Sequence, residues 1–156
     1  MAEAPDRKTV DLSAYPDLVV IYLGMRVEEP RGIETLKALR PQIDATVDEQ
    51  PDGLLLHERL MYGDDPPHTG MRQYWRDFES LQAWTKTLPH KQWWTDYLRD
   101  RGGWHETYFR RGGFESIFVD VEPGVGMAGF APTRPATGPM LGARARADAD
   151  RSAAAV

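Results

Sequence analysis

Histidine and tryptophan are the residue types in this chain whose spacing best supports chemistry, and the strongest grouping surrounds His90. Trp84 precedes His90, while Trp93 or Trp94, and then Tyr97, follow it at spacings that share one face of a helix. A neutral imidazole can bind a metal ion or move a proton near neutral pH, and indole rings favour apolar ligands. His90 and Trp84 are therefore candidate catalytic residues. The competing interpretation is a backbone-bonded histidine at a helix start beside a core tryptophan.

Two further histidines, His57 and His105, occur in segments with strand-like alternation, and each is followed by a glutamate. Neighbouring residues of a strand point to opposite faces, so His105 and Glu106 cannot act as one pair. If His57 and His105 share a face of the sheet, they could meet as metal ligands or as an acid–base pair. The fourth histidine, His68, belongs to a Pro-rich segment, 63–70, and is expected to be solvated.

Several common kinds of site are absent from the sequence. The chain has no cysteine, which removes disulfides, thiolate metal ligands and cysteine nucleophiles. It has no G-x-S-x-G elbow, no P-loop and no G-x-G-x-x-G before a helix, and this disfavours the commonest hydrolase, NTPase and nicotinamide-dependent classes. No histidine spacing such as H-x-x-x-H supports a non-heme metal site.

Composition places the chain among ordinary globular proteins. Its 156 residues suit one domain, and 41% hydrophobic with 28% charged residues is typical. A net charge of −5 speaks against a nucleic-acid partner, which requires a clustered basic face. No apolar run reaches the ~18 residues that a membrane span needs, and the N-terminus lacks the layout of a signal peptide, so we expect a cytoplasmic protein.

Hydrophobic periodicity predicts two helical regions and five strands. The strands are expected at residues 17–28, 54–62, 71–76, 104–111 and 114–121. The helices are expected at residues 33–49, with a kink or restart at Pro41, and at residues 78–100, with a division at Pro89. The order β-α-β-β-α-β with one extra strand predicts an α+β, ferredoxin-like fold.

The ferredoxin-like domain is expected to span residues 17–122, between two arms. Residues 1–16 are polar and form an N-terminal arm, while residues 123–156 are rich in Gly, Pro and Ala and are expected to be disordered at their end. Helices on one face of such a sheet leave aromatic residues exposed on the other face. A homodimer is the simplest arrangement that buries this second face.

A cavity is expected where the third strand, the following helix and the fourth strand meet. His105 joins His90 and Trp84 as a third catalytic candidate. The residues expected to contact a substrate there are aromatic, apolar or histidine side chains: Trp75, Trp94, Tyr97, Tyr74, His57 and Met25.

Several strings of the sequence resemble one known family. They are VVIYLGMRV, PDGLLLHERL, YWRDFESLQAW, PHKQWW, WHETY and GGFESIFVDV, in this order within roughly residues 15–145. The family is described as similar to the polyketide monooxygenase of the fumagillin pathway and belongs to the dimeric α/β-barrel superfamily. The resemblance implies a dimeric ferredoxin-like barrel and oxidative chemistry, within secondary metabolism, on a hydrophobic polyene or polyketide substrate.

Two further resemblances concern heme. The middle of the chain is similar to the heme-containing carotenoid ketolase of spheroidene metabolism, with matches at Trp75, Asp77 and His90. This resemblance implies heme b with His90 as the iron ligand. The heme-degrading oxygenases of the superfamily carry a helix tryptophan in a context similar to that of Trp84. Their accompanying Asn and His have no counterpart at the corresponding positions here, so the match to heme degradation is incomplete.

Three functions remain open from the sequence. The first is a monooxygenase-like enzyme with a Trp- and His-lined cavity, in which O2 is activated either by the substrate's own electrons, without a cofactor, or by heme b. The second is an oxygen-independent lyase or isomerase that uses the same histidines for acid–base chemistry. The third is a non-catalytic protein that binds an apolar ligand or heme. The fold alone does not choose among them.

Overall fold

The computed structural model describes residues 3–96, 101–110, 113–120 and 125–154, and the chain divides into two compact units. The sheet unit is Leu18–Tyr108, and the terminal unit combines Met1–Asp17 with Phe109–Val156. The strands are β1 (Arg7–Val10), β2 (Val19–Arg26), β3 (Leu54–Asp64), β4 (Pro67–Trp75), β5 (Gly103–Phe109), β6 (Phe118–Val119) and β7 (Thr133–Pro135). The helices are α1 (Arg31–Asp48), α2 (Phe78–Thr85), α3 (His90–Asp96), α4 (Ala143–Ala154) and the 3-10 turns η1 (Gly126–Gly129) and η2 (Gly138–Leu141). None of the helices in the described part of the chain has the length and apolarity to cross a membrane.

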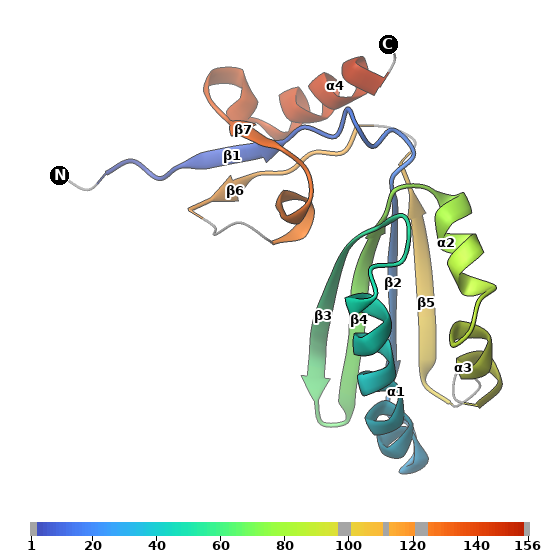
Figure 1. Ribbon diagram of the computed structural model, residues 1–156. Coiled ribbons are helices and arrows are strands. Elements are labelled where there is room, and N and C mark those ends of the chain that lie inside the picture. The colour runs from blue at the N-terminus through green and yellow to red at the C-terminus, as the bar shows by residue number, and fades with distance from the viewer. Residues whose placement is uncertain (1–2, 97–100, 111–112, 121–124, 155–156) are drawn as a thin grey trace. The chain divides into compact units, whose positions relative to one another are not determined.

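The sheet unit is built on four strands in the order β3-β4-β2-β5. β4 pairs antiparallel with both β3 and β2. α1 connects β2 to β3, while α2 and α3 lie between β4 and β5 in the chain. Figure 1 shows α1 lying across the sheet, with α2 and α3 beside β5. The predicted α+β, ferredoxin-like arrangement is therefore confirmed, and among the described residues these strands form an open sheet rather than a closed barrel.

Alternation along the central strands sorts their residues onto two faces. Val19 and Ile21 of β2 pack with Trp75 of β4 and Leu81 of α2 in the buried core. Trp75 is fully buried, with 0% of its surface exposed. We call this side of the sheet the helix-covered face and the other side the open face. Removing an indole and its aliphatic neighbours from water supplies a large share of the stability of such a small core.

Capping and proline explain where the helices of the sheet unit begin and end. The carboxylate of Asp77 accepts a hydrogen bond from the backbone N–H of Ser80 in the first turn of α2 (2.7 Å), so Asp77 is the N-cap of this helix. α2 ends before Pro89 and α3 begins at His90, so the predicted division is confirmed. α1 runs as one helix through Pro41. The restart at Pro41, one of the two outcomes expected from the sequence, therefore does not occur.

The two strands on either side of the Pro-rich segment 63–70 are longer than predicted and take up most of that segment. β3 continues to Asp64 and β4 begins at Pro67, so a turn of two residues joins the strands. The antiparallel pairing with β2 extends to His68. Alternation continues through this segment, but its prolines and glycines hide the pattern in the sequence.

The terminal unit contains a second sheet, in the order β6-β1-β7. The extra strand predicted over residues 114–121 is shorter than expected. Among the described residues of this segment, Phe118–Val119 form a strand, which pairs with β1. α4 holds the start of this segment in another way: the carboxylate of Asp150 accepts a hydrogen bond from the backbone N–H of Phe114 (2.7 Å). A backbone donor bonded to a side chain is not available to a neighbouring strand.

Two buried arginines hold α4 in the terminal unit, where the sequence predicts a disordered end. The side chain of Arg110 is 2% exposed, lies 2.6 Å from the carboxylate of Asp150 and donates to two backbone carbonyl groups of the N-terminal segment. Arg146, also buried, lies 2.8 Å from the carboxylate of Glu115. Composition does not reveal these ion pairs, because the partners are far apart along the chain. The division of the chain into an arm, a domain and a second arm stays a prediction.

Replacing Arg110 with methionine is expected to destabilise the terminal unit, because Asp150 would keep its buried charge without a partner. Loss of one member of a buried ion pair costs about 3–5 kcal/mol. Arg144→Met is the matched control, because the side chain of Arg144 is 83% exposed and its partner Asp148 is 52% exposed. The loss of this ion pair should change stability by about 0.5 kcal/mol or less. Hydrogen exchange of the α4 amides measures both variants, and equal protection in the two would contradict the assignment.

Candidate functional site

Four aromatic side chains on the helix-covered face form one group, the aromatic cluster: Trp75, Trp84, His90 and Trp93. Ring centroids are 5.6 Å apart for Trp75 and Trp84 and 4.9 Å apart for Trp84 and His90. Trp93 lies 6.1 Å from both Trp84 and His90. These separations are those of favourable aromatic pairs. The structure therefore brings together His90 and Trp84, two of the three predicted catalytic residues.

Hydrogen bonds fix the two fully or nearly buried indoles of the cluster. Trp75 donates its Nε1–H to Oε1 of Gln73 on the same strand (3.1 Å), and Trp93 donates to Oε1 of Gln42 on α1 (2.9 Å). A buried indole N–H needs such an acceptor, so both ring orientations are set by their partners. Trp84 and His90 are only partly buried. A ligand arriving from solvent would therefore meet these two side chains first, with Trp75 behind them.

The imidazole of His90 has one nitrogen committed to the backbone. Its Nδ1 lies 3.0 Å from the carbonyl oxygen of Thr85, and because a carbonyl only accepts, Nδ1 must carry the hydrogen. Burial lowers the pKa of His90 by more than the bond to Thr85 raises it, which favours the neutral ring. In that form Nε2 carries a lone pair, which can accept a proton or bind a metal. The same donor chemistry fits the proximal ligand of a heme iron.

His57 and His105 share the helix-covered side of the sheet but do not meet. His57 is opposite Gln73 in the β3–β4 register, and His105 faces away from its strand neighbour Trp104, whose ring lies on the open face. β3 and β5 are the two edges of the sheet, with two strands between them. At about 4.8 Å per spacing the two histidines are roughly 14 Å apart. The hypothesis that they form a pair is therefore wrong, and His105 is exposed.

The remaining predicted substrate contacts are dispersed. Met25 is buried on the helix-covered face of β2. Tyr74 is buried on the open face, where the guanidinium of Arg72 lies 5.4 Å from its ring centroid and where burial raises the pKa of Tyr74 to about 12. Trp94 belongs to α3, and Tyr97 lies outside the described residues. Tyr74 therefore cannot share a site with the aromatic cluster, because the sheet separates them.

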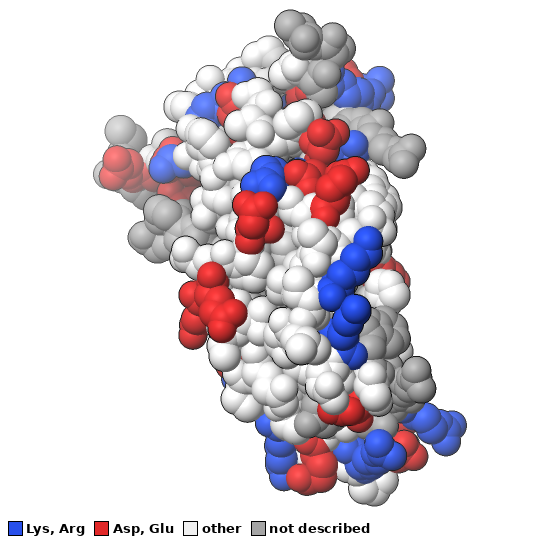
Figure 2. Space-filling view, turned by 45° about the vertical axis from the view of Figure 1, so that its right-hand side comes forward, with Lys and Arg blue, Asp and Glu red and all other residues white. Residues whose placement is uncertain are grey.

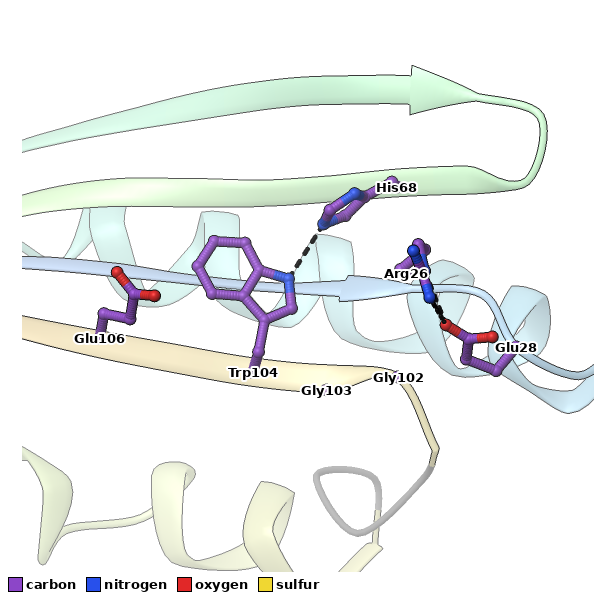
Figure 3. Close-up of a pocket in the computed structure, with 7 residues that line it drawn as sticks. All are labelled: Arg26, Glu28, His68, Gly102, Gly103, Trp104 and Glu106. Carbon is purple, nitrogen blue, oxygen red and sulfur yellow. Dashed lines mark hydrogen bonds and ion pairs between the residues drawn. The ribbon is translucent and has the colours of Figure 1, made fainter.

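The open face carries a hollow of about 430 Å³ that was not predicted from the sequence. Its lining residues are Arg26, Glu28, His68, Gly102, Gly103, Trp104 and Glu106 (Figure 3). Trp104 donates its Nε1–H to Nε2 of His68 (3.0 Å), and the His68 ring stacks on Tyr62 with centroids 4.7 Å apart. His68 is thus half-buried among aromatic rings, and the prediction that it is solvated is wrong. Figure 3 also shows Arg26 directed at Glu28, its ion-pair partner at 2.6 Å.

Two facing glycines make room for the rings beside this hollow. Gly24 of β2 is paired with Gly70 of β4. A Cβ atom on Gly24 would lie 3.2 Å from the Trp104 ring, and one on Gly70 would lie 3.1 Å from the Tyr62 ring. A Cβ atom would lie even closer, at 2.5 Å, to a backbone oxygen of the neighbouring strand, so a larger side chain at either position would clash with the backbone as well as with the ring. The glycines are visible in the sequence, but their pairing depends on the strand register, which the sequence does not give.

Charge does not mark out any one place on the surface drawn in Figure 2. Acidic and basic side chains are interspersed there, with uncharged surface between them. In the described part of the chain, no group of three or more His, Asp or Glu residues is arranged to hold a metal ion.

Comparison with known proteins gives a family and a fold. Residues 18–127 match the model of a family described as monooxygenase af470-like. No curated protein matches the chain. A solved protein of Shewanella oneidensis is 12% identical with a TM-score of 0.51, over 70% of this chain and 97% of that chain.

An aldoxime dehydratase is 24% identical with a TM-score of 0.62, over 94% of this chain and 44% of that chain. A second structure of such an enzyme, crystallised with butyraldoxime, gives 24% identity and a TM-score of 0.61, over 96% of this chain and 45% of that chain. At these identities the likeness concerns the fold, and this chain spans less than half the length of the aldoxime dehydratases.

Stability is expected to fall as the pH drops below about 6.5, the ordinary pKa of histidine in an unfolded chain. Burial lowers the pKa of both His57 and His90 in the folded chain, so below this pH the unfolded state binds more protons. Above this pH both histidines are neutral in the folded and in the unfolded chain. They then contribute nothing to the change of the free energy of unfolding with pH. Urea unfolding between pH 5 and 7.5 measures the effect. A double variant, His57→Gln with His90→Gln, should show a smaller loss, and an unchanged loss would contradict the pKa directions.

Proposed function

The chain belongs to the monooxygenase af470-like family, and from this premise we propose that it is a monooxygenase-like enzyme that oxidises a hydrophobic metabolite at the aromatic cluster. The observation that carries the proposal is the contact of the partly buried imidazole of His90 with the ring of Trp84, where burial lowers the pKa of His90 and so favours the neutral ring. It combines an apolar surface for the substrate with a basic nitrogen.

His90 acts in this proposal as a general base. Its Nδ1–H is held by the carbonyl of Thr85, so Nε2 receives the proton that leaves an activated carbon of the substrate. Conversion of a methylene to a carbonyl by one O2 releases one water, since R2CH2 + O2 gives R2CO + H2O. One oxygen atom enters the product and the other leaves as water with the two hydrogens. The substrate then supplies all four electrons, and no external reductant is required.

A second candidate function uses heme b, and the tautomer of His90 is the observation that favours it. His90 would provide Nε2 as the iron ligand, with Trp84 and Trp93 as apolar walls, and the bond from Nδ1 to a backbone carbonyl is the usual second contact of such a ligand. A bound heme would supply the activation of O2. An absorption spectrum after heme addition separates the two candidates, because a Soret band that disappears in His90→Ala supports heme ligation.

We also propose that two copies of the chain pack through the open face. Arg72 lies at its centre, 2.6 Å from the carboxylate of Glu58 and 3.3 Å from the hydroxyl of Tyr22. Tyr108 contributes an edge contact to Tyr22 and is 49% exposed. Aromatic rings around a satisfied arginine are typical of the centre of a protein interface.

Replacing His90 with alanine should lower oxygen-dependent turnover by about 10²–10⁴-fold, the usual contribution of a general base. Oxygen uptake with a panel of polyenes, ketones and polycyclic phenols measures this. Lys91→Ala is the matched control, because Lys91 is the next residue of α3 and is exposed. Equal uptake by His90→Ala and wild type would contradict the proposal. Full turnover without oxygen would replace it with a lyase or isomerase reaction.

Tyr108→Asp is expected to convert a dimer into a monomer, because it would place a charge in the buried centre of the proposed contact. Met61→Asp is the control, because Met61 is exposed on the other side of the sheet, where it alternates with its open-face neighbours on β3. Sedimentation velocity at micromolar concentration measures both variants. A wild-type chain that sediments as a monomer would contradict packing through the open face.

A further inference from the structure

A chain of hydrogen bonds runs from the aromatic cluster to His57 along the helix-covered face. Trp75 donates its Nε1–H to Oε1 of Gln73 (3.1 Å), and Nε2 of Gln73 lies 3.1 Å from Nδ1 of His57. Gln73 and His57 are directly opposite each other in the β3–β4 register, so strand pairing sets this contact. Trp75 and Gln73 are both buried, and water therefore does not compete for the first of these bonds.

The indole fixes the direction of every hydrogen bond in this chain. An indole N–H can only donate, so the group of Gln73 that faces it must be the amide oxygen. The amide nitrogen of Gln73 then faces His57 and donates to Nδ1, which must be an acceptor. Burial lowers the pKa of His57, which favours the neutral ring. A neutral imidazole that accepts at Nδ1 carries its hydrogen on Nε2.

The remaining N–H of His57 has no partner among the described residues. Its Nε2 is buried and makes no hydrogen bond there. The charged side chains around it are engaged elsewhere, since Arg59 pairs with Asp44 of α1 and Glu58 pairs with Arg72 on the open face. Buried donors in native proteins are nearly always hydrogen-bonded. We therefore expect the Nε2–H of His57 to have an acceptor in the functional, ligand-bound state.

We propose that Nε2–H of His57 donates a hydrogen bond to an oxygen atom of the substrate, which is therefore a ketone, enol or phenol with an apolar body rather than a pure hydrocarbon. Trp75 and His57 are diagonal neighbours on one face of paired strands, about 7–8 Å apart. A fused two-ring body spans that distance, so one molecule can contact the cluster and reach His57. This inference rests on the proposed function and names its substrate class.

The donor fixes the position of one end of the substrate. Because His57 is on β3 and His90 is on α3, which lies beside β5 at the other edge of the sheet, the two histidines contact different ends of the molecule. An oxygen atom bonded to Nε2–H of His57 therefore holds the apolar body against the aromatic cluster, and His57 takes no part in the proton transfer at His90.

A pair of isosteric probes tests the proposed hydrogen bond without turnover. 2-Acetylnaphthalene carries a carbonyl oxygen where 2-isopropenylnaphthalene carries a CH2 group, and the two are otherwise the same in shape. The ratio of their Kd values, measured by quenching of tryptophan fluorescence, should shift by about tenfold against the ketone in His57→Leu relative to wild type. His57→Gln keeps an N–H donor at similar reach and should retain most of the wild-type ratio.

A measurement on the unmodified chain accompanies the variants, in case a substitution at His57 prevents folding. Nitrogen-15 NMR of labelled histidine should show the hydrogen of His57 on Nε2, and the Nε2 signal should move with the ketone but not with the alkene. A hydrogen on Nδ1, or a Kd ratio equal in wild type and His57→Leu while both probes bind, overturns the inference and leaves the proposed function standing. Failure of both probes to bind overturns the apolar site and the inference together.

Discussion

The packing of Trp75 between the sheet and α2 is the interaction on which the rest of the sheet unit depends. Its ring is fully buried, and it touches both the aliphatic core of β2 and the ring of Trp84. Burial of the ring is favourable only if its N–H is bonded, and Gln73 supplies the acceptor. That requirement fixes the amide of Gln73 and, through it, the hydrogen of His57. One core side chain thus sets both the apolar wall and the polar donor of the proposed site.

Neighbouring residues of a strand point to opposite faces of the sheet, so residues that are adjacent in the sequence belong to two different surfaces. The helix-covered face holds the aromatic cluster and His57, which form the proposed reaction site. The open face holds Arg72, Tyr74 and the pair of His68 with Trp104, where the side chains bond one another. Adjacent residues such as Tyr74 and Trp75 therefore serve different purposes. The sheet acts as the partition between a proposed reaction site and a proposed contact between copies.

The sequence is sufficient to predict the parts of the site that arise from local spacing. His90 and Trp84 lie close together because they flank a short break between two helical segments, and periodicity reveals those segments. The contact of His57 with Gln73 depends on the register of two strands, which a hydrophobic pattern does not specify. The segment 114–121 has the composition of a strand, yet contacts with residues far along the chain decide its structure. Local sequence preference therefore predicts secondary structure correctly where no contact with residues far along the chain competes with it.

The most direct test of the account is to map a bound apolar ligand with the indole N–H signals in an NMR spectrum. Each tryptophan gives its own signal, and the two candidate places on the sheet unit contain different tryptophans. Titration with 2-acetylnaphthalene should move the signal of Trp84 and, to a lesser degree, that of Trp93. The signal of Trp104, which is bonded to His68 on the open face, should stay in place. Movement of Trp104 with an unchanged Trp84 would contradict the assignment of the reaction to the helix-covered face.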